Sequence, residues 1–230
     1  MLIEIRKYTS FKLLLMHFNH NVLNQAKDME QFCRGFAKSN NIQFCIRNLV
    51  FIDGINFESS ARVERYKGLN RMAKKLNYDI ILTAHHIDDQ IETLYMKKID
   101  GADWISNIGI RESIGKIKRP MLEVNKNMIM DYAKNRNLLW IEDPSNNDVS
   151  FRRNYIRKIE LPKLFKKNPN LGENLLLEAE FNRKKMDSIL NNYNMNKKLL
   201  IYKNSETFIK INLESILKLS LEELKLFVYW

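Results

Sequence analysis

The chain has 230 residues, of which 45% are hydrophobic, and carries a formal net charge of +11 with a pI near 9.5. This length fits one large domain or a domain and a half, and the hydrophobic content excludes a disordered chain. The charge favours a polyanionic partner, nucleic acid first and a membrane surface second, although AT-rich codon usage also enriches Lys, Asn and Ile.

Cysteine content and hydropathy exclude further classes of protein. The chain has two cysteines, Cys33 and Cys45, and no CxxC motif, which excludes a disulfide framework and a zinc or iron–sulfur knot and fits a reducing, cytoplasmic setting. It has no apolar run long enough for a transmembrane helix. Residues 1–12 lack the pattern of a signal peptide and are expected to be the tail of a helix.

Strands and helices are expected to alternate over the first hundred residues. Apolar runs predict strands, and a period of 3.6 residues predicts helices. The expected strands are Phe11–Phe18, Ile42–Phe51 and Asp79–Leu82, and the expected helices are Gln25–Ser39, Phe57–Leu76 with Asn56 as its cap, and one that contains Ile91–Lys98. This order is typical of right-handed βαβ units, so we predict an α/β fold with a parallel sheet and flanking helices.

The second half is expected to be richer in loops and helices, with a domain boundary that gives an α/β domain over 1–160 and a small, mainly helical region over 161–230. The expected elements are a loop over Gly101–Gly115, a helix over Asn127–Asn137, a strand over Leu138–Ile141, a turn cluster over Glu142–Asp148, a helix containing Arg152–Lys158 and ended by Pro162, a helix over Asn174–Tyr193, a strand over Thr207–Ile211, and a last helix capped by Ser220 with Glu223 in capping-box spacing.

Titratable side chains are crowded into Thr83–Thr93, which reads TAHHIDDQIET and directly follows the expected strand Asp79–Leu82. In α/β sheets, ligands bind at the carboxyl ends of strands. The amides of a helix N-terminus bind phosphate there, and carboxylates are suitable ligands for Mg²⁺. The alternative is structural: Asp88 or Asp89 caps the helix, with Glu92 completing a capping box, and the histidines are core residues.

Other polar and aromatic residues also have two interpretations. Arg62 and Arg65 share one helix face and suit a phosphate, or they are solvated partners of Glu58 and Glu64. The side chains of Arg153 and Arg157, one turn apart, suit RNA phosphates or a plain helix surface. Trp104 and Trp140 are expected to pack in the core rather than to stack on a base.

Several blocks in order give the chain a resemblance to the tRNA(Ile)-lysidine synthases of the PP-loop (N-type) ATP pyrophosphatase superfamily. The resemblance covers residues 11 to 165, and the AHHxDD block alone also occurs in related tRNA thiolases. The blocks are His17–His20, Asn56–Tyr66, Thr83–Thr93, Arg119–Leu122, Trp140–Asn146 and Arg153–Arg157, which resemble the family's HxxH, NxExxARxxRY, AHHxDDQxET, RPLL, EDxSN and RNxIR patterns.

The resemblance implies a ligase that uses ATP and Mg²⁺ to join L-lysine to C2 of the wobble cytidine-34 in the CAU anticodon of tRNA(Ile), through an adenylated cytidine. It also implies roles for particular residues. The implied catalytic residues are His85, His86, Asp88, Asp89, Glu92 and Arg62; those for ATP are Phe18, Asn19, Ala84 and His85; those for RNA are Arg65, Arg153, Asn154 and Arg157; and those for the metal are Asp88 and Asp89.

The sequence departs from this family in three places. It contains no SGGxDS phosphate loop, Asp100–Asp103 stands where the family has RGSG, and the family extends about two hundred residues further. We therefore expect an incomplete member whose 230 residues bind ATP weakly or not at all, because the loop amides form the main phosphate site. The alternatives are another PP-loop tRNA enzyme, such as a thiolase, and an RNA-binding remnant without catalysis.

Overall fold

The computed structural model describes residues 1–19, 26–49, 57–204 and 209–229. These residues form two compact units that interleave along the chain. Unit 1 comprises Met1–Ala84, Glu112–Pro120 and Asn127–Asp148, and unit 2 comprises His85–Arg111, Met121–Lys126 and Val149–Trp230. The expected division into 1–160 and 161–230 stays a prediction.

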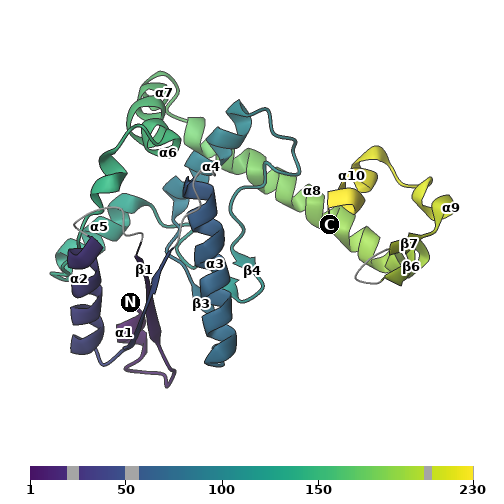
Figure 1. Ribbon diagram of the computed structural model, residues 1–230. Coiled ribbons are helices and arrows are strands. Elements are labelled where there is room, and N and C mark those ends of the chain that lie inside the picture. The colour runs from purple at the N-terminus through teal and green to yellow at the C-terminus, as the bar shows by residue number, and fades with distance from the viewer. Residues whose placement is uncertain (20–25, 50–56, 205–208, 230) are drawn as a thin grey trace. The chain divides into compact units, whose positions relative to one another are not determined.

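Within the described ranges, the parallel strands belong to unit 1 (Figure 1). The first residue of α5, Lys126, is assigned to unit 2, and the rest of that helix is assigned to unit 1. The elements are α1 (Leu2–Ile5), β1 (Leu14–Asn19), α2 (Ala26–Ser39), β2 (Gln43–Asn48), α3 (Phe57–Lys75), β3 (Ile81–Leu82), β4 (Ser113–Ile114), β5 (Ile117–Lys118), α5 (Lys126–Asn135) and the 3-10 turn η1 (Pro144–Asn147).

The strands of unit 1 form two hydrogen-bonded groups. In one, β1 runs parallel to β2, with Leu14 opposite Gln43 and Asn19 opposite Asn48. In the other, β3 runs parallel to β5, which also pairs antiparallel with β4. Parallel pairing between strands separated by helices confirms the predicted α/β class.

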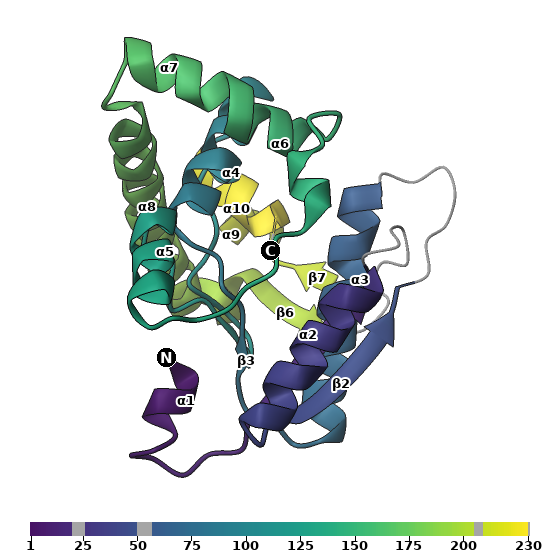
Figure 2. The same cartoon turned by 90° about the vertical axis from the view of Figure 1, so that its left-hand side faces the viewer.

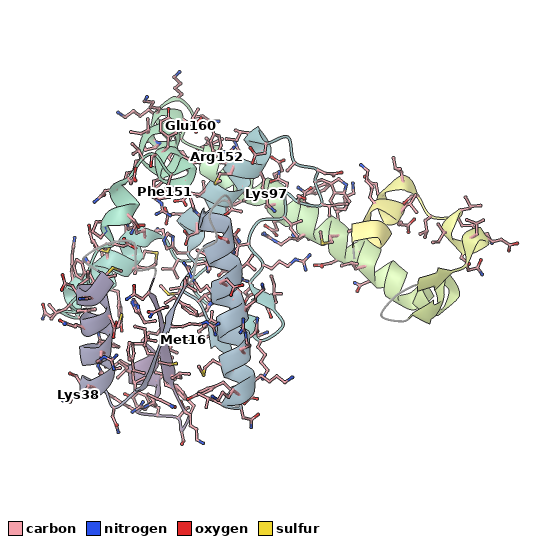
Figure 3. All side chains as sticks on the ribbon, in the orientation of Figure 1. Met16, Lys38, Lys97, Phe151, Arg152 and Glu160 are labelled. Atoms are coloured by element: carbon pink, nitrogen blue, oxygen red, sulfur yellow. The ribbon has the colours of Figure 1, made fainter. Side chains whose placement is uncertain are left out.

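Helices cover both faces of the β1–β2 pair, with α2 on one side and α3 on the other (Figures 1 and 2). Met16 of β1 lies between these helices in Figure 3. The backbone of α3 comes close to β1 at Gly68, where an added Cβ would lie 2.8 Å from the Phe18 ring. Further along α3, Ala73 packs with Ile81 and Ile117 in a buried cluster. Thus α3 contacts strands of both hydrogen-bonded groups.

Unit 2 is mainly helical, as expected for the end of the chain. One segment changes helix type twice, from α to π after Tyr155 and back to α after Glu160, a residue labelled in Figure 3. The elements are α4 (Ile87–Ile99), α6 (Arg152–Tyr155), the π-helical turn η2 (Ile156–Glu160), α7 (Leu161–Lys167), α8 (Leu171–Leu200), β6 (Ile201–Asn204), β7 (Ile209–Ile211), α9 (Leu213–Ile216) and α10 (Leu221–Tyr229).

The core of unit 2 lies along α8. Leu94 of α4 packs against Leu175 and Ala179 of α8, and all three are at most 2% exposed. A second cluster joins Met186 of α8 to Leu226 of α10 and includes the partly buried Trp104, as predicted for that tryptophan. Burial of these apolar stripes holds the helices together.

Two predicted elements are wrong. Residues 138–141 form no strand, and Leu139 is 84% exposed while Trp140, expected in the core, is 45% exposed. An apolar run becomes a strand only where a neighbouring strand pairs with it, and the structure gives this run none. Pro162 does not end a helix; it lies in the first turn of α7, directly after the π-helical turn η2.

Most other predicted elements are present, although α8 begins three residues before and ends seven residues after the predicted helix Asn174–Tyr193. The last helix has the predicted capping box, since the Ser220 N–H donates to Glu223 Oε2 at 2.8 Å and the Glu223 N–H donates to Ser220 Oγ at 3.2 Å. The His20 motif position and the predicted Asn56 cap lie outside the described residues. None of the helices in the described ranges combines the length and apolarity that a membrane crossing requires.

Candidate functional site

The helix that follows the AHHxDD stretch begins at Ile87, and His86 is its N-cap with an extended backbone. The His86 N–H donates to Asp89 Oδ2 at 3.0 Å, which is the return bond of a capping box. The expectation that Asp88 or Asp89 is the N-cap, with Glu92 closing the box, is therefore wrong. The helix starts earlier, so Asp89 occupies the third position and takes the role expected of Glu92.

Asp88 lies in the first turn of α4 and bonds to a backbone amide of the same unit. Its Oδ2 accepts a hydrogen bond from the backbone N–H of Lys126, the first residue of α5, at 2.8 Å. The same oxygen lies 3.2 Å from His86 Nδ1, and the Asp88 side chain is 45% exposed. A negative charge at a helix N-terminus is favourable because the helix dipole is positive there. Asp88 is thus both structural and accessible.

Glu92 lies one turn further along α4 and is almost fully buried, with 3% of its side chain exposed. Two guanidinium groups surround its carboxylate. Arg153 Nε donates to Oε2 at 2.8 Å, and Arg157 donates from Nε to Oε1 at 2.5 Å and from Nη2 to Oε2 at 2.8 Å. The hydrogen bond with Glu92 raises the pKa of the Arg157 guanidinium. These charge-assisted, partly bidentate bonds are among the strongest hydrogen bonds in proteins.

Asp89 completes this group, because one Nη2 atom of each arginine lies 3.3 Å from its Oδ1. We call Asp89, Glu92, Arg153 and Arg157 the carboxylate–guanidinium cluster. Its two negative and two positive charges cancel, which makes its partial burial tolerable. The structure therefore brings four of the predicted site residues together in a neutral cluster, whereas the Asp88 side chain is exposed and makes no ion pair with either arginine of that cluster.

The predicted magnesium ligands fit the ion unequally. Mg²⁺ prefers one or two carboxylates plus water and phosphate oxygens. Asp88 suits that role, whereas Asp89 already accepts bonds from the His86 amide and from arginine. No group of three or more His, Cys, Asp and Glu side chains in the described part of the chain is arranged to hold a metal ion. The metal assignment to Asp88 and Asp89 stays a prediction, favoured by geometry at Asp88.

The predicted ATP residues are divided between the units. Phe18, Asn19 and the exposed Ala84 belong to unit 1, and the partly buried His85 belongs to unit 2. Asn19 is 6% exposed at the carboxyl end of β1. The Phe18 ring packs against Gly68, so it supports α3. Contact of these four residues with ATP stays a prediction.

The predicted arginines of α3 have different environments from Arg153 and Arg157. Arg62 and Arg65 are exposed, and the Arg62 guanidinium carbon lies 5.1 Å from the centre of the Tyr66 ring. Partial burial, and secondarily the charge of Arg62, lower the pKa of Arg65. Asn154 is only 9% exposed in α6, so burial limits its use as an RNA contact.

Sequence reasoning assigned no role to Tyr66 or Arg119, although both stand in the motif blocks. Arg119 is 3% exposed, and its Nη2 donates to the Tyr66 hydroxyl at 3.2 Å. This bond fixes the ring against which Arg62 stacks. The RPML block, in which Arg119 directly precedes Pro120 and two apolar residues, was the signal for a positioned arginine.

The chain is similar to a known family and to curated proteins. A model described as the PP-loop domain matches residues 1–164. The tRNA(Ile)-lysidine synthase of Staphylococcus epidermidis is 30% identical over 91% of this chain and 53% of its own length. That of Wigglesworthia glossinidia brevipalpis is 38% identical over 74% of this chain and 43% of its own. The chain thus spans about half the length of the curated relatives it matches.

Among solved structures, the U34-tRNA thiolase NcsA from Methanococcus maripaludis with its [4Fe-4S] cluster is similar, with a TM-score of 0.63 and 19% identity. The match covers 78% of this chain and 64% of the thiolase chain. At that identity the likeness supports the fold alone. Because the family model covers well over half of the sequence, the chain belongs to the PP-loop domain family.

Proposed function

We propose that the chain is part of a tRNA-modifying ligase that joins L-lysine to C2 of cytidine-34 in tRNA(Ile) with a CAU anticodon, at the expense of ATP. The observation that carries this proposal is the match to curated tRNA(Ile)-lysidine synthases over as much as 91% of the chain. The PP-loop match over residues 1–164 includes the carboxylate–guanidinium cluster and Asp88. The family supports ATP as the energy source.

The proposed reaction has two steps. The cytidine O2 attacks the α-phosphorus of ATP, and pyrophosphate leaves; the lysine amine then attacks C2, and the O2 atom leaves with AMP. Mg²⁺, when bound, would neutralise the charge of the departing pyrophosphate. We assign Asp88 to the metal or to the lysine ammonium, and His85 or His86 to phosphate binding or proton transfer. Arg62 would meet phosphate charge in the first step.

Within this proposal the carboxylate–guanidinium cluster has a positioning role. Glu92 is buried behind Arg153 and Arg157, so it holds α4 in place and sets the position of Asp88 one turn before it. The contacts favour this role for the two arginines over direct RNA binding. RNA contact by Arg65 remains part of the proposal, because the residue lies on the exposed surface of α3.

A thiolase is the alternative that the fold comparison raises. Protein-held [4Fe–4S] clusters use cysteine thiolates, typically four, and this sequence has only two cysteines. They lie on different elements, Cys33 in α2 and Cys45 in β2. Burial raises the pKa of the Cys33 thiol, which disfavours the reactive thiolate. The cysteines therefore favour the ligase.

The test is mass spectrometry of nucleosides from tRNA(Ile) incubated with ATP, Mg²⁺ and isotopically labelled lysine. Two proteins are compared: the 230-residue chain, and the chain extended by the in-frame codons that precede Met1. We expect labelled lysidine at position 34 with the extended protein and little or none with the 230 residues. A thiolated nucleoside, or unmodified tRNA with both proteins, would contradict the ligase.

A further inference from the structure

The outer face of α3 carries a groove that none of the assigned roles uses as a whole. Its volume is about 620 Å³. Its lining residues recur three or four positions apart, so they share one side of the helix. They are Arg62, Val63, Tyr66, Lys67, Asn70, Arg71 and Lys74.

The groove is positively charged. It has four cationic side chains, and Glu64 beside it pairs with Lys67 at 2.9 Å and more loosely with Arg71 at 3.9 Å. Counting these five residues gives a net charge of +3. Among the side chains that the structure describes, no carboxylate lies within ion-pair distance of Arg62 or Lys74. Such a surplus attracts an anion.

An aromatic ring is held at the centre of this charge. The Tyr66 hydroxyl accepts a bond from the buried Arg119, and Arg62 stacks on the same ring with its guanidinium carbon 5.1 Å from the ring centre. Val63 beside it is 49% exposed. Planar groups of this kind stack on unpaired bases, while flanking cations bind the phosphates.

We propose that this groove binds the sugar–phosphate backbone of an RNA strand, with one base stacked at Arg62 and Tyr66. The cations from Arg62 to Lys74 extend over about 18 Å of helix, at 1.5 Å per residue, which is long enough to follow several phosphates. A membrane surface is a poorer match, because Val63 is the one exposed aliphatic side chain among the groove residues. The identification of the RNA as a tRNA rests on the proposed function, but the binding of RNA by this groove does not depend on it.

The first experiment measures binding of a fluorescent anticodon-arm RNA hairpin at several salt concentrations, without ATP or lysine. The test variant is Lys67→Gln, Arg71→Gln, Lys74→Gln. The control is Lys163→Gln, Lys166→Gln, Lys167→Gln, which removes the same charge from exposed positions on α7. Because each phosphate contact adds about 0.7 to 0.9 to the slope of log K against log salt, we expect the slope to fall by roughly 2 in the test variant only.

Equal losses in the two triple variants, or an unchanged slope in the first, would overturn the proposal. The proposal would also be overturned if poly-L-glutamate displaced the hairpin as well as unlabelled RNA does at the same concentration of negative charge. In that case the groove would recognise charge alone. Thermal unfolding of each variant verifies that it is folded. Lysidine formation is measured in a separate experiment. The proposed ligase activity can therefore be refuted while RNA binding at α3 is confirmed, or the other way round.

A second comparison tests the stacked base. Tyr66→Phe and Tyr66→Leu both lose the hydroxyl bonded to Arg119, but only the leucine variant loses the ring. Stacking on an aromatic side chain strengthens binding several-fold per base, so we expect Tyr66→Leu to bind the hairpin about tenfold more weakly than Tyr66→Phe, with the same salt slope. Equal affinity of the two variants would exclude the stacked base.

Discussion

Arg157 and Glu92 meet through two parallel hydrogen bonds, 2.5 Å and 2.8 Å long, although 65 residues separate them in the sequence. Arg153 adds a third bond to the same carboxylate. These bonds tie α4 to the α6–η2 segment, at the turn where α6 passes into the π-helix. Two predicted catalytic residues, Asp89 and Glu92, thus form a structural connection with two predicted RNA-binding arginines.

Glu92→Gln is expected to destabilise the protein by about 2 to 3 kcal/mol. Loss of one partner of a fully buried ion pair costs about 3–5 kcal/mol, and the partial exposure of both arginines reduces that cost. Urea unfolding measures the change. The matched control is Glu180→Gln, whose pair with Lys184 is exposed and screened by water, so its loss should change the stability little. Equal effects of the two substitutions would show that Glu92 does not hold α4.

Replacing two helical glycines by alanine should change the free energy of unfolding in opposite directions. At Gly68 the new methyl group would lie 2.8 Å from the Phe18 ring and 3.3 Å from Arg47 Cδ. Overpacking of this kind costs about 1–3 kcal/mol, so we expect a net loss of about 1 kcal/mol. At Gly35 nothing lies within 4 Å, so the higher helix propensity of alanine should stabilise by about 0.5 to 1 kcal/mol. Thermal unfolding distinguishes the two signs, and a stabilising Gly68→Ala would contradict the packing.

Gly109→Ala is expected to be more damaging than Gly115→Ala. Both glycines have positive φ, which is strained for alanine, but only at Gly109 would the methyl group approach Gln90 Oε1, to 2.5 Å. That oxygen accepts the Ile110 N–H, and Gln90 Nε2 donates to the Ile110 carbonyl at 2.8 Å. We expect a loss of about 1 kcal/mol at Gly115 from backbone strain and at least 2 kcal/mol at Gly109. Urea midpoints compared between the two variants test this order.

The cap of α10 should depend on pH. Hydrogen bonds from the Ser220 backbone and hydroxyl hold the pKa of Glu223 below its ordinary value of 4.5. Because the folded-state pKa is the lower one, the capping contribution is present above pH 4.5 and is lost as the pH falls through the folded-state value. Ser220→Ala should cost about 1 kcal/mol near neutral pH. Hydrogen exchange along α10 measures both effects, and Glu223→Gln should remove the pH dependence.

Local patterns determined most of the elements of this protein. Periodicity predicted α2 and α3 to within one or two residues, and the capping box at Ser220 follows from the spacing of two side chains. The α/β class follows from the order of elements, since strands separated by helices pair in parallel. Ordered motif blocks predicted the family, which the match over residues 1–164 confirmed.

Only the tertiary structure decided which apolar runs pair with a neighbouring strand and which charged side chains neutralise one another. The apolar run Leu138–Ile141 has the composition of a strand but stays irregular and exposed, because strand formation depends on a neighbouring strand. The sequence placed carboxylates at Asp88, Asp89 and Glu92 without distinguishing them. Helix packing buries Glu92 against two arginines 61 and 65 residues away and leaves Asp88 accessible, and contacts over that sequence distance have no signature in local spacing.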